Sequence, residues 1–121
     1  MILFNSQPRN RHGFNRDQHL RAVEHLRRNP CLYNRRESDY EETDEAKQAL
    51  IQQVADDLNV TKKRFTTWYG TMRSEVGRTK RKVVEEGLKE EEMTVLQRRR
   101  WQEFEFMREV ITFRKRVVRV R

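Results

Sequence analysis

Hydrophobic residues recur every three or four positions in four stretches of the chain, which is the spacing of one face of an α-helix. The first stretch contains Leu20, Val23 and Leu26. Asn15, followed three residues later by Gln18, has the pattern of a capping box, so we expect the first helix to begin near Asn15. Pro30 is expected to end it. The loop over residues 30–42 that follows keeps hydrophobic anchors at Leu32, Tyr33 and Tyr40.

The second and third stretches are separated by a very short polar turn. The second predicts a helix from Thr43 to about Leu58, with hydrophobic positions at Leu50, Ile51, Val54, Ala55 and Leu58. Asn59 suits the turn after that helix, and Thr61 suits the N-cap of a third helix over about residues 62–86, which Gly87 would end. Two helices joined by two or three residues in this way indicate a helix-turn-helix.

The predicted third helix is long for so small a chain. Its hydrophobic stripe consists of Phe65, Trp68, Tyr69, Met72, Val76 and Val83. Some 25 residues give about 37 Å of helix, so we expect its C-terminal part to extend beyond the core. Residues 88–94 form a charged connector. A fourth helix is predicted over residues 94–113, with hydrophobic positions at Leu96, Trp101, Phe104, Met107, Val110 and Ile111.

These elements predict an all-α fold, a three-helix bundle with a helix-turn-helix and an additional C-terminal helix. We expect residues 1–13 to form a flexible basic arm, residues 14–113 the helical domain and residues 114–121 a basic tail. No stretch approaches the roughly 20 apolar residues of a membrane span, and the hydrophobic start of the chain is too short for a signal peptide. The single cysteine, Cys31, excludes an internal disulfide.

The sequence has no motif of an enzyme. It has no phosphate-binding glycine loop, no nucleophile motif and no carboxylate pair in an apolar setting. His12, His19 and His25 lack metal-ligand spacing, and His19 and His25 are expected on the surface of an arginine-rich helix. We therefore expect no catalytic residues, no metal, no cofactor, no small-molecule substrate and no membrane partner.

Charge is concentrated in two blocks of opposite sign. The 121 residues include 27 Lys and Arg and 19 Asp and Glu, a net charge of +8. Residues 61–82 carry eight basic residues and one acid, a net charge of +7, whereas residues 31–60 carry three basic residues and eight acids, a net charge of −5. We expect the second and third helices to neutralise each other in part where they meet. The outer face of the third helix would stay positive and attract an anionic partner.

The face of the third helix opposite its hydrophobic stripe is small in the middle and basic at the ends. It comprises Lys63, Thr67, Gly70, Thr71, Ser74, Gly77, Arg78 and Arg81. A glycine inside a helix lowers helix stability by about 1 kcal/mol relative to alanine. Close approach of the helix backbone to another surface would explain why this helix contains two glycines. Threonine, lysine and arginine on such a face can contact bases and phosphates in a major groove.

Duplex DNA is therefore the first predicted partner. The candidate DNA-binding residues are Lys62, Lys63, Arg64, Thr67, Thr71, Arg78, Arg81 and Lys82 on the third helix, with Arg9 and Arg11 on the arm. A basic helix face can equally be only solvated, and small residues can equally serve helix packing. The rival hypothesis is a protein-interaction module that uses the C-terminal helix or the acidic residues 37–57. Its candidate residues are Glu41, Glu42, Asp56 and Asp57.

An ordered set of residues over about positions 14–111 resembles the MADF domain, a Myb/SANT-like domain of transcription and chromatin factors. The matching segments are Leu20-x-x-Val23, Asn29-Pro30-Cys31-Leu32-Tyr33, Asp39-Tyr40, Leu50–Asn59, Tyr69-x-x-Met72-Arg73-x-x-Val76 and Trp101-x-x-Phe104. Ile51 stands where the family commonly has Trp. The resemblance implies a three-helix Myb/SANT-like fold, a nuclear location, double-stranded DNA as ligand and a recognition role for the third helix. Chromatin or transcription-factor proteins would be further partners.

Overall fold

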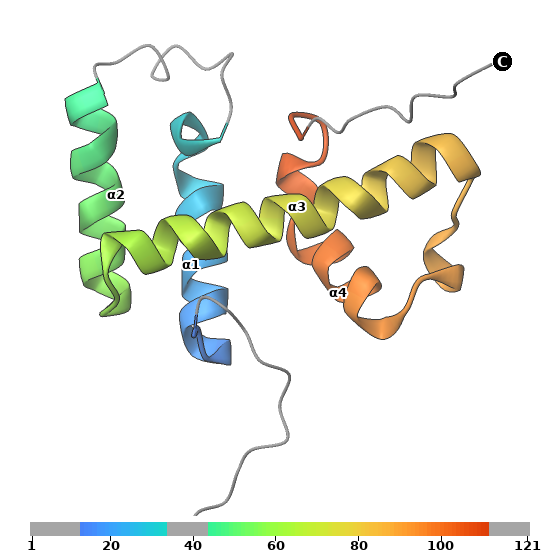
Figure 1. The fold of residues 1–121 in the computed structure, drawn as a ribbon, viewed down its shortest axis with the longest axis horizontal. Coiled ribbons are helices and arrows are strands. Elements are labelled where there is room, and N and C mark those ends of the chain that lie inside the picture. The colour runs from blue at the N-terminus through green and yellow to red at the C-terminus, as the bar shows by residue number, and fades with distance from the viewer. Residues whose placement is uncertain (1–12, 34–43, 112–121) are drawn as a thin grey trace, which may run out of the picture.

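The computed structural model describes residues 13–33 and 44–111 of the chain (Figure 1). Four α-helices follow one another: α1 (Arg16–Arg28), α2 (Asp44–Leu58), α3 (Lys62–Glu86) and α4 (Val95–Glu103). Three short 3-10 helices lie between and after them: η1 (Pro30–Leu32), η3 (Glu90–Glu92) and η4 (Glu105–Met107). The described residues contain no strand, and the predicted all-α class is confirmed.

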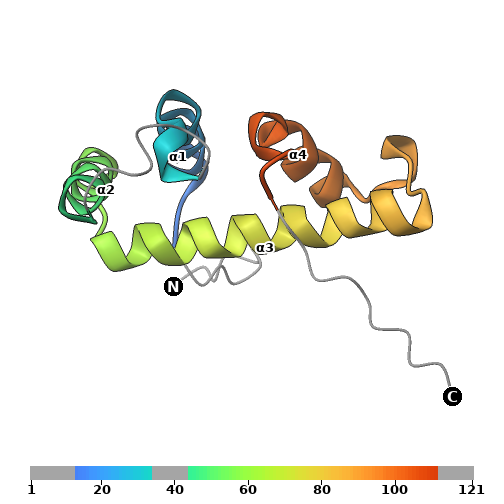
Figure 2. The same cartoon turned by 90° about the horizontal axis from the view of Figure 1, so that it is seen from above.

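The long helix α3 lies along one side of the molecule, and the other three helices lie on its opposite side. Figure 2 shows α2, α1 and α4 in a row against α3, with α1 between the other two. The same order appears in Figure 1, where α3 crosses in front of this row. One side of α3 therefore faces away from every other helix of the described chain.

The local sequence signals act as predicted at the helix ends. Asn15 caps α1, with its side chain accepting from the Gln18 amide at 2.8 Å and the Gln18 side chain accepting from the Asn15 amide at 3.0 Å. Asn59 has a positive φ of 58°, which turns the chain out of α2. The Thr61 hydroxyl then caps α3, and Gly87 ends α3 in the left-handed region with φ of 70°. The turn between α2 and α3 is therefore set by three adjacent residues, 59–61.

The hydrophobic core lies between α3 and the row of helices. Its largest fully buried side chains are Leu26, Val54, Leu58, Trp68, Met72, Val76, Phe104, Met107 and Ile111. Trp68 is at the centre, with the Phe14 ring stacked on it at 5.4 Å between centroids and the Phe65 ring at 5.8 Å. Cys31 is half-buried and packs against this core. Residues from 14 to 111 thus share a single core.

One prediction about the C-terminal part is wrong. The helix expected over residues 94–113 ends at Glu103, and the chain turns into η4. The Arg108 guanidinium donates to the Trp101 carbonyl at 2.6 Å, and Lys80 Nζ donates to the carbonyls of Arg108 and Ile111. These bonds occupy carbonyl groups that a continuous helix would use. The predicted extension of α3 beyond the core is seen at its last turn, where Val84 is 63% exposed, whereas α4 packs against the preceding part and Thr79 there is buried.

His19 is buried, not on the surface as predicted. Its Nδ1 accepts a hydrogen bond from the Trp68 indole at 3.1 Å, and its Nε2 lies 2.8 Å from Glu103 Oε1. An indole N–H can only donate, so Nδ1 must carry the lone pair and Nε2 the proton that is donated to Glu103. His19 thereby joins α1 to both α3 and α4.

Glu103 is the anionic member of this network. Its side chain is 13% exposed and also pairs with Arg16 at 2.8 Å and Arg100 at 3.0 Å. Burial alone would raise the pKa of Glu103, but its interactions with His19, Arg16 and Arg100 outweigh the burial and lower the pKa to about 2. The carboxylate is therefore stabilised in its charged form at all ordinary pH values.

We predict that Glu103→Gln lowers the stability of the fold and flattens its acid dependence. The pKa of this carboxyl falls from 4.5 to about 2 on folding, so its contribution is complete above pH 4.5 and is lost as the pH falls toward 2. At pH 7 the variant should lose about 2 kcal/mol of unfolding free energy. Urea denaturation followed by circular dichroism between pH 7 and pH 2.5 measures both effects. Glu105→Gln, at an exposed position two residues away, is the control, and an unchanged acid profile for Glu103→Gln would contradict the prediction.

Candidate nucleic-acid interface

Five exposed residues follow one another along the side of α3 that no other described helix covers. They are Lys63, Thr67, Gly70, Ser74 and Arg78, and we call them the outer stripe. Their spacing of three or four residues places them on one face of the helix. Lys63 and Arg78 form no ion pair within the described part of the chain. The outer stripe is therefore a straight surface with a small centre and a free positive charge at each end.

Hydroxyl groups near the outer stripe are bonded back to the helix itself. Thr71, which is half-buried, donates to the Thr67 carbonyl at 2.9 Å, and Thr66, which is exposed, donates to the Lys63 carbonyl at 2.9 Å. These bonds fix the side-chain rotamers and leave lone pairs and methyl groups for an external contact. Sequence reasoning omitted Thr66 and Ser74 from the candidate DNA-binding residues, although the exposed position of Ser74 follows from the helical period.

The remaining predicted residues of α3 are less exposed than expected. Lys62, Arg81 and Lys82 are half-buried. The Arg81 Nε is fully buried and makes no hydrogen bond with the described residues. Gly77, expected on the exposed face, is buried, so close approach of a partner can explain Gly70 but not Gly77.

Two basic residues in the middle of α3 are used inside the fold. Arg73 donates to the Tyr69 hydroxyl at 2.9 Å. Lys80 donates to the carbonyls of Arg108 and Ile111 that follow η4. The net charge of +7 in residues 61–82 therefore overstates the charge that α3 presents to a partner.

Arg64 connects the start of the described chain to α3. It is exposed, as predicted, but its Nη2 donates to the Gly13 carbonyl at 2.8 Å. Gly13 has a positive φ of 71°, and the next residue, Phe14, is buried against Trp68. Residues 1–12, with Arg9 and Arg11, lie outside the described residues, yet the point where they join the fold is the first turn of α3.

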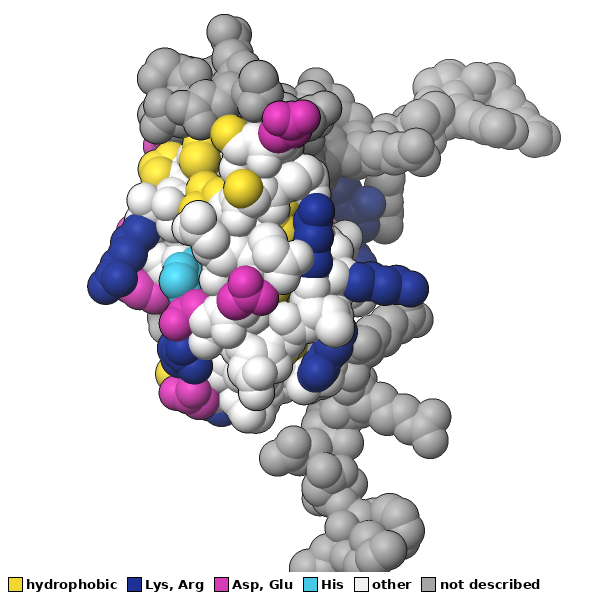
Figure 3. Space-filling view, turned by 90° about the vertical axis from the view of Figure 1, so that its left-hand side faces the viewer, with side chains coloured by type: hydrophobic (Ala, Val, Ile, Leu, Met, Phe, Trp, Pro, Cys, Tyr) yellow, Lys and Arg dark blue, Asp and Glu magenta, His cyan; other side chains and the backbone are white. Residues whose placement is uncertain are grey.

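One acidic residue of α2, Asp57, contacts α1. Asp57 Oδ2 lies 2.6 Å from His25 Nε2 and 3.0 Å from Arg21 Nη2. The hydrogen bond from His25, with the charge of Arg21, lowers the pKa of Asp57. Asp56 is exposed and accepts from the Gln52 amide at 2.9 Å. Figure 3 shows the resulting mixture of acidic and basic side chains at this end of the molecule.

Within the described residues, ion pairs join Asp57 of α2 to α1 and Glu75 of α3 to α4. The expected partial neutralisation of the second and third helices where they meet stays a prediction. Glu41 and Glu42, the other candidates of the rival hypothesis, lie outside the described residues.

A family model described as "Alcohol dehydrogenase transcription factor Myb/SANT-like" matches residues 8–108 of the chain. The chain belongs to the MADF family. The match covers all four helices and the Arg64–Gly13 contact, and it makes the chain a member of a DNA-binding and not an enzyme family. No curated protein and no solved structure matched the chain in the comparisons.

Two kinds of site are absent from the described residues of this MADF domain. None of its helices is both long enough and apolar enough to cross a bilayer. Among residues 13–33 and 44–111, no group of His, Cys, Asp and Glu side chains is arranged to hold a metal ion.

We predict that Gly13→Ala destabilises the domain by about 1 kcal/mol. A Cβ at Gly13 would be strained at φ of 71° and would lie 2.5 Å from Arg64 Nη2. Thermal or urea unfolding of Gly13→Ala, Arg64→Ala and the double variant measures the coupling of the two residues. The cost of Gly13→Ala should be smaller in the Arg64→Ala background, where only the backbone strain remains. An equal cost in both backgrounds would show that Arg64 does not hold Gly13.

Proposed function

We propose that this MADF domain binds double-stranded DNA with the outer stripe of α3 in the major groove, as part of a nuclear transcriptional or chromatin regulator. The observation that carries the proposal is the open side of α3, which no other described helix covers over the length of the outer stripe. A single α-helix fits into a major groove about 12 Å wide only if the neighbouring helices lie on the side of it that faces away from the DNA. The row of α2, α1 and α4 meets this requirement.

The side chains of the outer stripe suit the two kinds of contact that DNA offers. Gly70 and Ser74 at the centre let the backbone come close to base edges, and Thr67 can contact a base or a thymine methyl. Arg78 can read guanine or bind phosphate, and Lys63 can bind phosphate at the other end. The half-buried Lys62, Arg81 and Lys82 flank the stripe and add charge toward the backbone on both sides.

The contact between Arg64 and Gly13 adds the basic arm to this surface. Gly13, the first described residue after the segment that contains Arg9 and Arg11, is held at the first turn of the helix that would enter the groove. Four or five residues of extended chain span roughly 15 Å, which is enough to reach an adjacent minor groove. Arg64 would then act by positioning the arm.

The acidic surface supports the rival function, a protein-interaction module, less well than α3 supports DNA binding. Asp57 already pairs with Arg21 and His25, and Glu45 and Asp56 are the remaining exposed acids of the proposed surface within the described residues. A basic partner would therefore gain two carboxylates there, and Asp56 already accepts a hydrogen bond from Gln52. Protein partners from chromatin would more readily add to the DNA-bound domain than replace DNA as its ligand.

We predict that duplex binding falls steeply with salt and that Lys63→Ala, Arg78→Ala and Arg81→Ala together reduce the slope by about 2 to 3, since each phosphate contact contributes about 0.9. Fluorescence anisotropy with a labelled duplex between 50 and 300 mM salt (about these limits) measures the slope. The control triple variant, Arg28→Ala, Lys89→Ala and Arg99→Ala, removes the same charge from exposed positions away from the outer stripe. If the wild-type domain binds the duplex weakly and its affinity does not change with salt, the proposal is wrong.

We predict opposite effects of Gly70→Ala on folding and on DNA binding. A Cβ at Gly70 meets no atom within 4 Å, so alanine should stabilise α3 by about 0.5–1 kcal/mol. The same methyl would separate the helix from the DNA and lower duplex affinity by roughly tenfold. Urea unfolding and anisotropy on one preparation give both values. Increased stability with unchanged affinity would show that DNA does not approach α3 at Gly70.

A further inference from the structure

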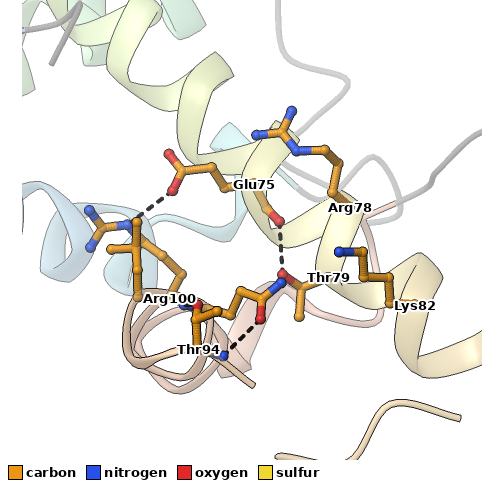
Figure 4. A pocket seen from close by; sticks show the side chains of 8 residues that line it. Glu75, Arg78, Thr79, Lys82, Thr94 and Arg100 are labelled. Atoms are coloured by element: carbon orange, nitrogen blue, oxygen red, sulfur yellow. Dashed lines mark hydrogen bonds and ion pairs between the residues drawn. The ribbon is translucent and has the colours of Figure 1, made fainter. Parts of the chain in front are cut away.

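A pocket of about 210 Å³ lies between the second half of α3 and the N-terminal turn of α4 (Figure 4). Glu75, Arg78, Thr79 and Lys82 line it from α3, and Thr94, Leu96, Gln97 and Arg100 line it from the start of α4. The one carboxylate of the lining, Glu75, is paired with Arg100. Arg78 also belongs to the outer stripe, so the pocket opens beside the surface that we propose to contact DNA. Neither Thr94 nor Gln97 was a candidate residue from the sequence.

The two cations on the α3 wall have no anionic partner in the described chain. Arg78 and Lys82 are one helical turn apart and lie on the same side of α3, where their like charges repel each other. The third cation, Arg100, is already neutralised, because it pairs with Glu75 at 3.5 Å and Glu103 at 3.0 Å. An anion in the pocket would relieve the repulsion between Arg78 and Lys82 without breaking an existing ion pair.

The α4 wall adds hydrogen-bond donors. Thr94 and Gln97 form a capping box, in which Gln97 Oε1 accepts from the Thr94 amide at 2.9 Å and Thr94 Oγ1 accepts from the Gln97 amide at 3.1 Å. This leaves the Gln97 Nε2 group and the Thr94 hydroxyl proton without a partner among the described residues. The positive end of the α4 dipole lies at the same place. The free groups of both walls are therefore donors or cations, which select an anion with several acceptor oxygens.

We propose that this pocket binds a phosphate group of the DNA backbone, with Arg78 and Lys82 on one side and Thr94 and Gln97 on the other. The proposal rests on the proposed DNA-binding function and extends it from α3 to α4. A phosphate held here would fix the register of α3 in the groove, because the pocket and the outer stripe share Arg78. The C-terminal helix would then bind DNA as well as support α3.

Gln97→Glu tests this pocket without removing the helix cap. A glutamate oxygen accepts from the Thr94 amide as well as a glutamine oxygen does, since Glu is as common as Gln in capping boxes. The substitution replaces the amide donors by a negative charge that repels phosphate. Gln53→Glu makes the same change of charge at an exposed position of α2, at the opposite end of the molecule, and is the matched control. Lys82→Gln removes a charge from the other wall.

The readout is duplex affinity and its salt dependence, with circular dichroism to confirm that each variant is folded. We expect Gln97→Glu to lower affinity by roughly tenfold and, like Lys82→Gln, to reduce the salt slope by about 1, whereas Gln53→Glu should change affinity less than twofold. If Gln97→Glu and Gln53→Glu have the same duplex affinity and salt slope, the pocket does not bind a DNA phosphate, although the proposed DNA binding by α3 would still hold.

A titration with inorganic phosphate separates the pocket from the proposed function. Chemical shifts of the Gln97 side-chain amide and of the Thr94 and Lys82 backbone amides report binding in the wild type. If the wild type fails to bind any duplex, the proposed function is wrong, and phosphate-induced shifts that Gln97→Glu abolishes would still support an anion site for free phosphate. The absence of both duplex binding and phosphate-induced shifts would overturn the pocket as well.

Discussion

The buried indole N–H of Trp68 is the constraint on which the arrangement of the helices depends. The Trp68 side chain is fully buried, and an indole can only donate, so an acceptor must be buried with it. His19 supplies that acceptor from α1, 49 residues away in sequence. The other nitrogen of His19 then needs an acceptor of its own, and Glu103 at the end of α4 supplies it. One buried tryptophan thus holds α1, α3 and α4 in fixed relation, because leaving any of these groups unpaired would cost about 1–3 kcal/mol.

This network also explains how a helix of 25 residues can keep one side open. The first half of α3 is held by the core that it shares with α1 and α2, and the second half is held by α4. Lys80 closes the contact by donating to the two carbonyls after η4. All of these contacts lie on one side of α3. The outer stripe consequently does not take part in packing the helices together, so its residues are available to bind a partner.

The features that the sequence predicted well are those that depend on neighbours within one helical turn. The Asn15 cap, the Asn59 turn and the Gly87 end need only their own local geometry, and the period of the hydrophobic residues is enough to orient α3. The burial of His19 and the early end of α4 depend on partners 28 to 84 residues away, which no local pattern encodes. The candidate site divides in the same way. Lys63, Thr67 and Arg78 follow from the helical period, whereas the Arg64 contact with Gly13 spans 51 residues.

The electrostatic potential in front of α3 depends more on where the acidic residues lie than on the net charge of +8. Glu75 is the one acid of residues 61–82, and it lies on the α4 side, paired with Arg100. Asp57 of α2 turns toward Arg21 and His25 of α1. Each of these carboxylates therefore neutralises a cation within the row of helices behind α3. Coulomb interactions weaken with distance and with screening by water, so these acids reduce the positive potential in front of α3 very little. The ion pairs that stabilise the fold thereby also keep the outer stripe positive.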